Sequence, residues 1–288
     1  MAPEMVTKSQ SSGLCPPAEP NISIREYIYF LPYPLPPGTP VPYSTGLPSH
    51  NPLNLPPHQF EPTSTLVLTT PLKTFLDIRL YKLPSPSFAP SLPNTGDSSR
   101  LEWGFAGTSS SAPIAKAGWE GVTHSTWVHW VDSRFPVGSP EMPADEGDMY
   151  PISPELSLEH GHAYHPSLAA VKSHEEMWRD VAVESTNQGG LKVCAVLRVE
   201  SEKEGVRGVV VRVGQFVQGL LMHGERVTVE RWECDGEEGM EGRGWKRTAR
   251  IGDGFLPCAV LFRTVVLAVG GMVKYHDFEW VVEEAWEW

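Results

Sequence analysis

The sequence lacks several features that would assign it at once to a familiar class. Its 288 residues contain no GxSxG elbow, no GxxxxGK[ST] phosphate loop and no HExxH motif. The corresponding hydrolase, nucleotide-binding and zinc-protease signatures are therefore excluded. Its four cysteines, Cys15, Cys194, Cys234 and Cys258, form no CxxC pair. This spacing argues against a zinc ribbon or a disulfide framework, and we interpret the cysteines as thiols in a reducing compartment.

Positive charge and long apolar runs are also scarce. The formal net charge is −12, and such a field repels nucleic acid and anionic membranes, so we expect neither as a partner. The N-terminal stretch MAPEMVTKSQSSG has no apolar core of a signal peptide. No apolar run approaches the ~18 residues of a membrane span. These absences predict a soluble, cytoplasmic protein.

Proline is nearly absent after residue 166. Of 28 prolines, 27 precede residue 167, and eleven lie between Pro32 and Pro62. Proline fixes φ and removes a backbone donor, so this segment cannot form a central strand or a helix. We predict a long proline-rich loop over residues 32–62, which is either a disordered linker or a lid that packs on the surface.

Alternating apolar and polar residues predict strands through most of the remaining chain, as in SIREYIYFL and HSTWVHWVD. Helical signal is confined to residues 167–181. Many short strands with glycine-rich turns indicate sheets that close or pack on each other. We predict an all-β protein of two consecutive antiparallel β-barrel domains with one short helix. Residues 1–20 are expected to be disordered, 21–145 to form the N-terminal barrel with the proline-rich loop, and 146–288 to form the C-terminal barrel.

Two strands carry polar residues beside bulky apolar ones. Trp127, His129 and Val131 share one face of their predicted strand, and Arg212 shares a face with Phe216 and Gln218. A charge inside a barrel must be paired or face a wet cavity. His129 is therefore either a hydrogen-bonded core residue or a proton donor in a pocket. Arg212 marks either a ligand cavity or a solvent-exposed face.

Four histidines gather between residues 160 and 174, and they raise the question of a metal site. His160 and His162 would share a strand face, and His165 and His174 follow. Glycine and proline break the segment EHGHAYHP into a loop, where nothing fixes ligand geometry. We therefore predict a solvated histidine cluster, with no metal and no cofactor.

The motifs LEWGFAGTSS, WVHWVD, YPISPE, EEMWRDV, VLRVES and GVVVRVGQFVQGLL occur in one order along about residues 100–225. In this order they resemble the fungal Hri-type family. The resemblance implies two successive antiparallel barrels, distantly like lipocalins and sometimes paired as homodimers, with no established chemistry. It also implies that Trp103 plugs one barrel end, and that Gly104 and Gly107 let neighbouring chain pack closely. Family members tend to be apolar where this chain has His129 and Arg212.

Two classes of function follow from these features. The first is a cofactor-independent enzyme of fungal natural-product biosynthesis that cyclises an apolar polyketide or terpenoid, by analogy with two-β-domain hetero-Diels–Alderases. In this hypothesis His129 and Arg212 are the catalytic donors, and Trp127, Phe216, Gln218 and Trp119 bind the substrate. The second class is a non-catalytic interaction protein or small-molecule carrier. The sequence favours the enzyme slightly.

Overall fold

The computed structural model describes residues 16–44, 59–83, 91–165, 168–187, 189–236, 244–263 and 267–288. Its first eight strands close into an antiparallel barrel, in which each strand pairs with the next and β8 pairs with β1. The barrel strands are β1 (Asn21–Phe30), β2 (Thr63–Thr69), β3 (Thr74–Tyr81), β4 (Leu101–Pro113), β5 (Thr123–Asp132), β6 (Ala144–Ser153), β7 (Leu156–His165) and β8 (Ala170–Val181).

The second half of the chain forms a seven-stranded antiparallel sheet in the order β13-β12-β11-β10-β9-β15-β14. Its strands are β9 (Val193–Ser201), β10 (Val206–Val213), β11 (Phe216–His223), β12 (Arg226–Cys234), β13 (Trp245–Ile251), β14 (Met272–Tyr275) and β15 (Phe278–Glu287). Three short 3-10 helices are described, η1 (Ser98–Arg100), η3 (Glu202–Glu204) and η4 (Pro257–Phe262). The all-β class is therefore confirmed.

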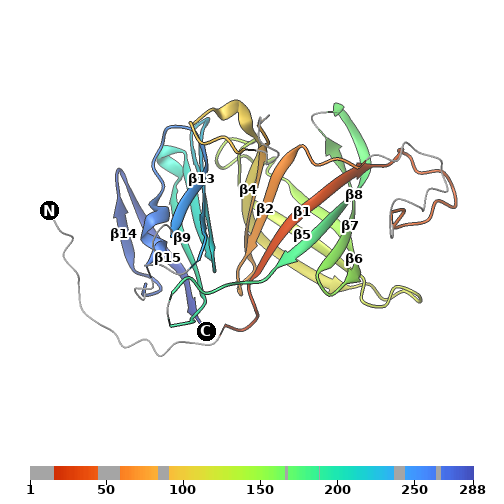
Figure 1. The fold of residues 1–288 in the computed structure, drawn as a ribbon. Coiled ribbons are helices and arrows are strands. Elements are labelled where there is room, and N and C mark those ends of the chain that lie inside the picture. Colours follow the sequence, from red (N-terminus) through yellow and green to blue (C-terminus); the bar gives the residue numbers. More distant parts are fainter. Residues whose placement is uncertain are drawn as a thin grey trace.

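This sheet differs from the second closed barrel that the sequence suggested, because β13 and β14 are its two edges. One face packs on the first barrel, as Figure 1 shows. The other face is covered by η4, whose Leu261 and Cys258 pack with Val210 and Leu221 of the sheet. A sheet that buries both faces in this way does not need to close on itself.

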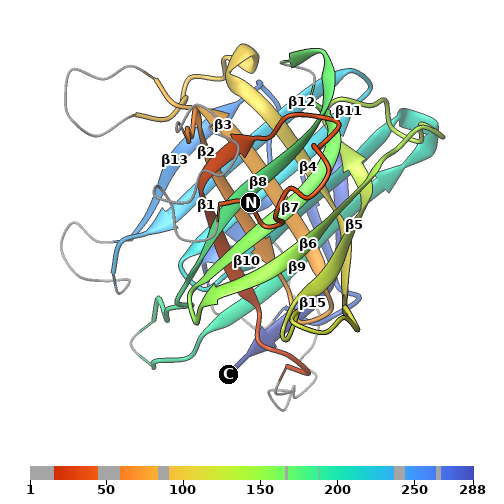
Figure 2. The same ribbon diagram turned by 90° about the vertical axis from the view of Figure 1, so that its right-hand side faces the viewer.

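The largest hydrophobic core lies between the barrel and the sheet. Leu76, Ile78 and Leu80 point outward from β3 and are fully buried against Val209 and Val211 of β10, together with residues of β11 and β12. Figure 2 looks onto the barrel and shows β1, β8, β7 and β6 in front of the sheet strands. On the side that meets the sheet, the barrel is therefore apolar on its outer surface.

The predicted helix at residues 167–181 is wrong, because the described part of this segment forms the strand β8. β8 is hydrogen-bonded to β1 on one side and to β7 on the other. From Ser173 to Trp178 every residue is buried, so both faces of the strand are covered. Good helix formers such as Glu175, Glu176 and Met177 adopt the strand here because two ladders and two packed faces outweigh a propensity of under about 1 kcal/mol per residue.

The barrel extends further along the chain than the predicted domain boundary at residues 145–146. That boundary lies inside β6, and β6, β7 and β8 are all needed to close the barrel. The first structural unit therefore runs to Val181, and the sheet begins at Val193.

Residues 32–44 of the proline-rich segment pack against the barrel instead of acting as a linker, and residues 59–62 of the segment are also described. The ring of Tyr43 is buried and stacks on Tyr29 of β1, with 5.9 Å between the ring centroids. The Glu175 carboxylate accepts hydrogen bonds from the backbone N–H groups of Tyr43 and Ser44. Burial raises the pKa of Glu175 to about 7, although these two bonds oppose the shift. Residues 45–58 of the predicted loop, and residues 1–15 of the predicted disordered terminus, lie outside the described residues.

Gly107 in LEWGFAGTSS lies at a bulge between β4 and β5. The register of the pair shifts between Ala106 and Gly107, and a Cβ at Gly107 would lie only 1.8 Å from the carbonyl oxygen of Val128. The expected close approach of neighbouring chain at this glycine is thus present. Among the described residues, no helix is long and apolar enough to cross a bilayer.

Candidate functional site

The barrel lumen is lined by polar and charged side chains, the reverse of its outer face. β3 shows the inversion most clearly, because successive strand residues point to opposite sides. Leu76 and Ile78 point outward into the core shared with the sheet, whereas Asp77 and Arg79 point inward, where they line a cavity. The lumen is therefore where this chain concentrates chemistry-bearing groups.

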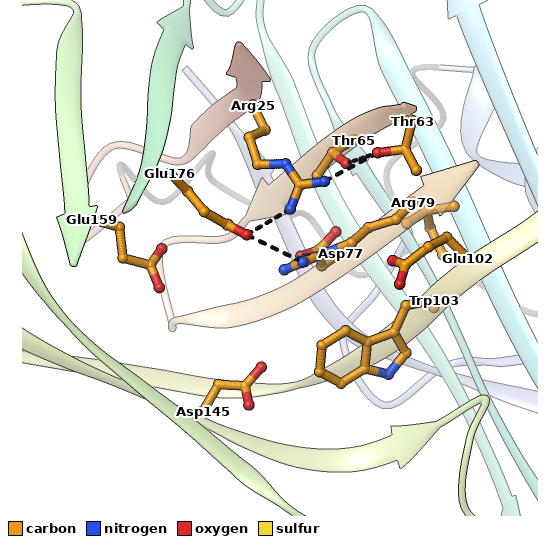
Figure 3. A network of polar contacts seen from close by, with 12 residues as sticks. Arg25, Thr63, Thr65, Asp77, Arg79, Glu102, Trp103, Asp145, Glu159 and Glu176 are labelled. Atoms are coloured by element: carbon orange, nitrogen blue, oxygen red, sulfur yellow. Dashed lines mark hydrogen bonds and ion pairs between the residues drawn. The ribbon is translucent and has the colours of Figure 1, made fainter. Parts of the chain in front are cut away.

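Two arginines and a shared carboxylate form an ion network in the lumen (Figure 3). Arg25 of β1 donates Nη1–H to Glu176 Oε1 at 2.6 Å and Nε–H to Glu61 Oε2 at 2.7 Å. Arg79 donates Nε–H and Nη2–H to Asp77 Oδ2 at 3.0 and 2.9 Å, and its Nη1 lies 3.6 Å from Glu176 Oε1. Burial disfavours the charge of Glu176, but Arg25 and Arg79 outweigh it and lower its pKa to about 2.

Two further carboxyl groups, Asp145 of β6 and Glu159 of β7, point into the lumen (Figure 3). No ion pair is found for Glu159 among the described residues, and its Oε2 accepts a hydrogen bond from Trp178 Nε1 at 2.9 Å. The ion-pair partner of Asp145 is His129, at 3.7 Å. Burial and the charge of Glu176 raise the pKa of Glu159 to about 8, and burial also raises the pKa of Asp145. These two groups form the least neutralised part of the lumen.

A glycine on the neighbouring strand makes room for the Glu159 side chain. Gly147 of β6 pairs with Gly161 of β7, and a Cβ at Gly147 would lie 2.8 Å from Glu159 Cγ and 2.9 Å from its Oε1. Any larger residue at position 147 would displace the carboxyl group. The sequence thus places a small residue where the lumen needs space for an acid.

Two cavities enter the lumen and meet at the same side chains. One has a volume of about 220 Å³ and is lined by Trp103, His165 and His174 among others. The second has a volume of about 440 Å³ and is lined by Phe75, Phe105, Trp127 and Trp178, with Ser109, Ser111, Ser125 and Thr69. Arg79, Asp145 and Glu159 line both cavities. The lumen therefore has one wall of aromatic side chains and a second of charged side chains, and both can contact one small molecule.

His129 is buried beside the larger cavity. Its Nδ1 lies 2.8 Å from Asp132 Oδ2, and its ring stacks on Phe105 with 4.3 Å between the centroids. The bulge at Gly107 corrects the predicted strand faces, because Asp132 now shares the lumen side with His129 while Val131 points into the core. The Asp132 carboxylate also accepts a hydrogen bond from Trp103 Nε1 at 2.8 Å.

The predicted tryptophan sites separate in the structure. Trp127 lines the 440 Å³ cavity, and its role in binding a substrate stays a prediction. Trp119 instead packs edge-on against Tyr150, with the Lys116 ammonium 3.7 Å from its ring centroid. Trp103 lines the 220 Å³ cavity, where the Arg134 guanidinium lies 3.9 Å from its ring.

Arg212 does not reach the barrel. It is 1% exposed on the face of the sheet that η4 covers, and it donates hydrogen bonds to the carbonyls of Gly214 and Leu261 and to Thr186 Oγ1. These contacts bind Arg212 into the packing of η4 against the sheet. The predicted pair of His129 and Arg212 in one pocket is therefore not formed.

Phe216 and Gln218 lie at the interface of barrel and sheet. Phe216 belongs to the large apolar core. Gln218 is fully buried, donates Nε2–H to the carbonyl of Leu66 at 2.9 Å and accepts from Arg231 Nε at 2.9 Å. The structure thus places both residues outside the lumen that Trp127 lines.

The four histidines lie on two strands instead of in a loop. His160 and His162 occupy the outer face of β7, and His165 lies at the mouth of the lumen, with its Nε2 3.0 Å from His174 Nδ1 of β8. Burial lowers the pKa of His165 and of His174 to about 4. In the described ranges, no three His, Cys, Asp or Glu side chains are grouped so that they could hold a metal ion.

The main residues of the lumen were not identified from the sequence. The available signal was in TFLDIRLY, where Asp77 and Arg79 alternate with Leu76, Ile78 and Leu80. A strand with charges on one face and leucines on the other is usually placed with its leucines inside the barrel. Here the apolar face points outward to a second sheet, so the charges fill the lumen.

Comparison with known proteins gives a family and a fold. A family model described as Protein HRI1 matches residues 47–284. A crystal structure of the uncharacterized protein YLR301w from Saccharomyces cerevisiae is similar, with a TM-score of 0.62 and 18% identity over 92% of this chain and 98% of that chain. No curated protein matches the sequence. The expected homodimer, cytoplasmic location and role in secondary metabolism stay predictions.

Proposed function

We propose that the chain, which belongs to the Protein HRI1 family, binds a small polar organic molecule inside its closed barrel. The observation that carries this proposal is the meeting of two cavities, of about 220 and 440 Å³, at Arg79, Asp145 and Glu159. A packed structural barrel fills its interior with apolar side chains. This barrel buries charged groups there, at a cost that purely structural packing does not require.

The lining favours a ligand that offers hydrogen bonds over a wholly apolar one. Phe75, Phe105 and Trp127 would contact a flat or apolar part, whereas Asp145 and Glu159 would be left desolvated by it. Desolvating a carboxyl group without a partner costs about 1–3 kcal/mol or more. An apolar polyketide or terpenoid would therefore fit this lumen poorly.

Carriage or sensing of the ligand agrees with the geometry better than cyclisation does. A pericyclic enzyme of the predicted kind needs its two donors on one substrate. Because Arg212 lies on the covered face of the sheet, it cannot act together with His129. The non-catalytic binding hypothesis needs only the lumen.

A matched pair of substitutions on β5 tests the proposal. Ser125 lines the larger cavity, so Ser125→Trp fills it, whereas Val128→Trp places the same indole on the exposed outside of the same strand. A fragment library would be screened by ligand-observed NMR against the wild type and both variants. We expect hits that Val128→Trp retains and Ser125→Trp loses. Hits that survive in Ser125→Trp, or a complete lack of hits with the wild type, would refute lumen binding.

A further inference from the structure

The charges of the lumen define the ligand more narrowly than its shape does. We infer that the ligand is a small organic ammonium, whose positive charge lies between the carboxyl groups of Asp145 and Glu159 and whose body packs on the aromatic wall. This inference rests on the proposed function, because it concerns the same lumen. It adds the sign of the ligand's charge, and this can be wrong while lumen binding is right.

The arginines of the lumen already face carboxylates. Arg25 donates to Glu61, Glu176 and Thr63, and Arg79 donates two hydrogen bonds to Asp77. Two guanidinium groups thus face the three carboxylates of Glu61, Glu176 and Asp77. An anionic ligand would have to compete with these internal partners for the same donors.

The carboxyl groups on the other wall have no such neutralisation. Within the described chain, Glu159 has no ion-pair partner, and Asp145 has His129 at 3.7 Å, beyond hydrogen-bonding distance. Glu159 is 8% exposed and lines both cavities. An ammonium bound here would favour ionisation of both carboxyl groups and would donate charge-assisted hydrogen bonds to them, whereas a bound anion would oppose their ionisation.

One buried atom independently calls for a donor from the ligand. Asp77 is 3% exposed and lines the larger cavity, and its Oδ1 has no hydrogen-bond partner within the described part of the chain. This carboxylate oxygen accepts hydrogen bonds, which an ammonium donates and a carboxylate does not.

The aromatic wall suits the same ligand. Phe75, Phe105, Trp127 and Trp178 line the cavity that Asp77, Asp145 and Glu159 also line. Aromatic faces attract cations, by about 0.5–2 kcal/mol, and stack on flat apolar groups. A primary amine on an aromatic body therefore matches both walls at once.

Three indoles that differ in one group form the test. Tryptamine carries an ammonium, tryptophol a hydroxyl and indole-3-acetate a carboxylate at neutral pH. Binding of each to the full-length protein would be measured by isothermal titration calorimetry at pH 7. We expect tryptamine to bind at least roughly tenfold more tightly than tryptophol, and indole-3-acetate to bind most weakly, because one charge-assisted hydrogen bond accounts for a factor of this size.

Variants locate the charge. Glu159→Gln and Asp145→Asn should each weaken tryptamine at least roughly tenfold and leave tryptophol unchanged. Asp148→Asn is the matched control, because Asp148 lies on the outer side of β6, hydrogen-bonded to His124, and it should change neither affinity. If one of the two lumen variants fails to fold, the other carries the test.

The outcomes separate the two proposals. Equal binding of tryptamine and tryptophol, with both lost in Ser125→Trp, would overturn the ammonium inference and leave lumen binding intact. Tighter binding of indole-3-acetate would do the same. Tryptamine binding that Ser125→Trp retains would overturn both proposals. If none of the three indoles binds, the ammonium inference is overturned, and the fragment screen decides lumen binding separately.

Discussion

Glu159→Gln should make the protein more stable at neutral pH, although it removes a buried hydrogen-bonding group. The folded protein holds the Glu159 proton until about pH 8, because burial and the charge of Glu176 raise its pKa. The unfolded chain releases this proton near the ordinary pKa of 4.5. Between these pH values the folded state binds more protons, so its stability falls as the pH rises. Glutamine cannot ionise, and the variant avoids this loss.

The size of the effect follows from the pH interval. Each pH unit above 4.5 lowers the free energy of unfolding of the wild type by about 1.4 kcal/mol through this group. The loss therefore reaches about 3 kcal/mol at pH 7. The charged groups facing Glu159 are Glu176 on β8, Asp145 on β6 and Arg79 on β3. They are the same in both proteins, so their contributions largely cancel in the comparison.

Urea unfolding of both proteins between pH 4 and pH 8 measures the difference directly. We expect the free energies of unfolding to differ by a small amount at pH 4, and the advantage of Glu159→Gln to grow to about 3 kcal/mol at pH 7. Glu155→Gln, a change at an exposed turn, should show no such growth. A difference between Glu159→Gln and the wild type that is constant with pH would show that the carboxyl group is ionised in the folded protein, and would refute the reasoning.

Three further substitutions probe the framework around the lumen. Arg212→Ala leaves the carbonyls of Gly214 and Leu261 without their donor and should cost about 1–3 kcal/mol in urea unfolding while ligand affinity stays the same; a loss of ligand binding in the folded variant would place Arg212 in the site after all. Gly107→Ala puts a methyl group 1.8 Å from the Val128 carbonyl oxygen and should lower the melting temperature through overpacking of about 1–3 kcal/mol, so an unchanged melting temperature would contradict the bulge. Leu76→Ala should lower the free energy of unfolding by about 2–5 kcal/mol, because Leu76 is fully buried between barrel and sheet. The control Leu72→Ala, at an exposed turn, should change it by less than about 0.5 kcal/mol. Equal effects of the two substitutions would show that the interface is not a hydrophobic core.

The sequence predicted the class of fold because strand alternation is a local property. SIREYIYFL and HSTWVHWVD became β1 and β5, with bounds that differ by a residue or two. The segment SLAAVKSHEEMWRDV was predicted as a helix because its residues favour one in isolation. Only the ladders to β7 and β1 make it a strand, and β1 lies at the other end of the barrel sequence.

The candidate site was harder to predict, because it depends on which face of each strand is inside. Strand parity correctly grouped Trp127 with His129, but a bulge reversed the faces after His129 and brought Asp132 beside it. Parity also grouped Arg212 with Phe216 and Gln218, and this grouping is wrong. The turn between β10 and β11 pairs Arg212 with Val217, so Arg212 lies on the opposite face of the sheet from Phe216 and Gln218. Asp77 and Arg79 could be recognised as lumen residues only once the outward leucines of β3 had a second sheet to cover them.

The outward leucines also constrain how the protein can be made. A ribosome completes β8 at Val181 before it has made any strand of the sheet, which starts at Val193. Until β10 and β11 have been synthesised, nothing covers Leu76 and Ile78. A barrel that closed at that stage would expose an apolar surface to solvent. The N-terminal barrel therefore completes its core only after the C-terminal sheet has been synthesised. We expect a fragment truncated just after Val181 to aggregate through this exposed apolar surface instead of forming a stable, shorter barrel.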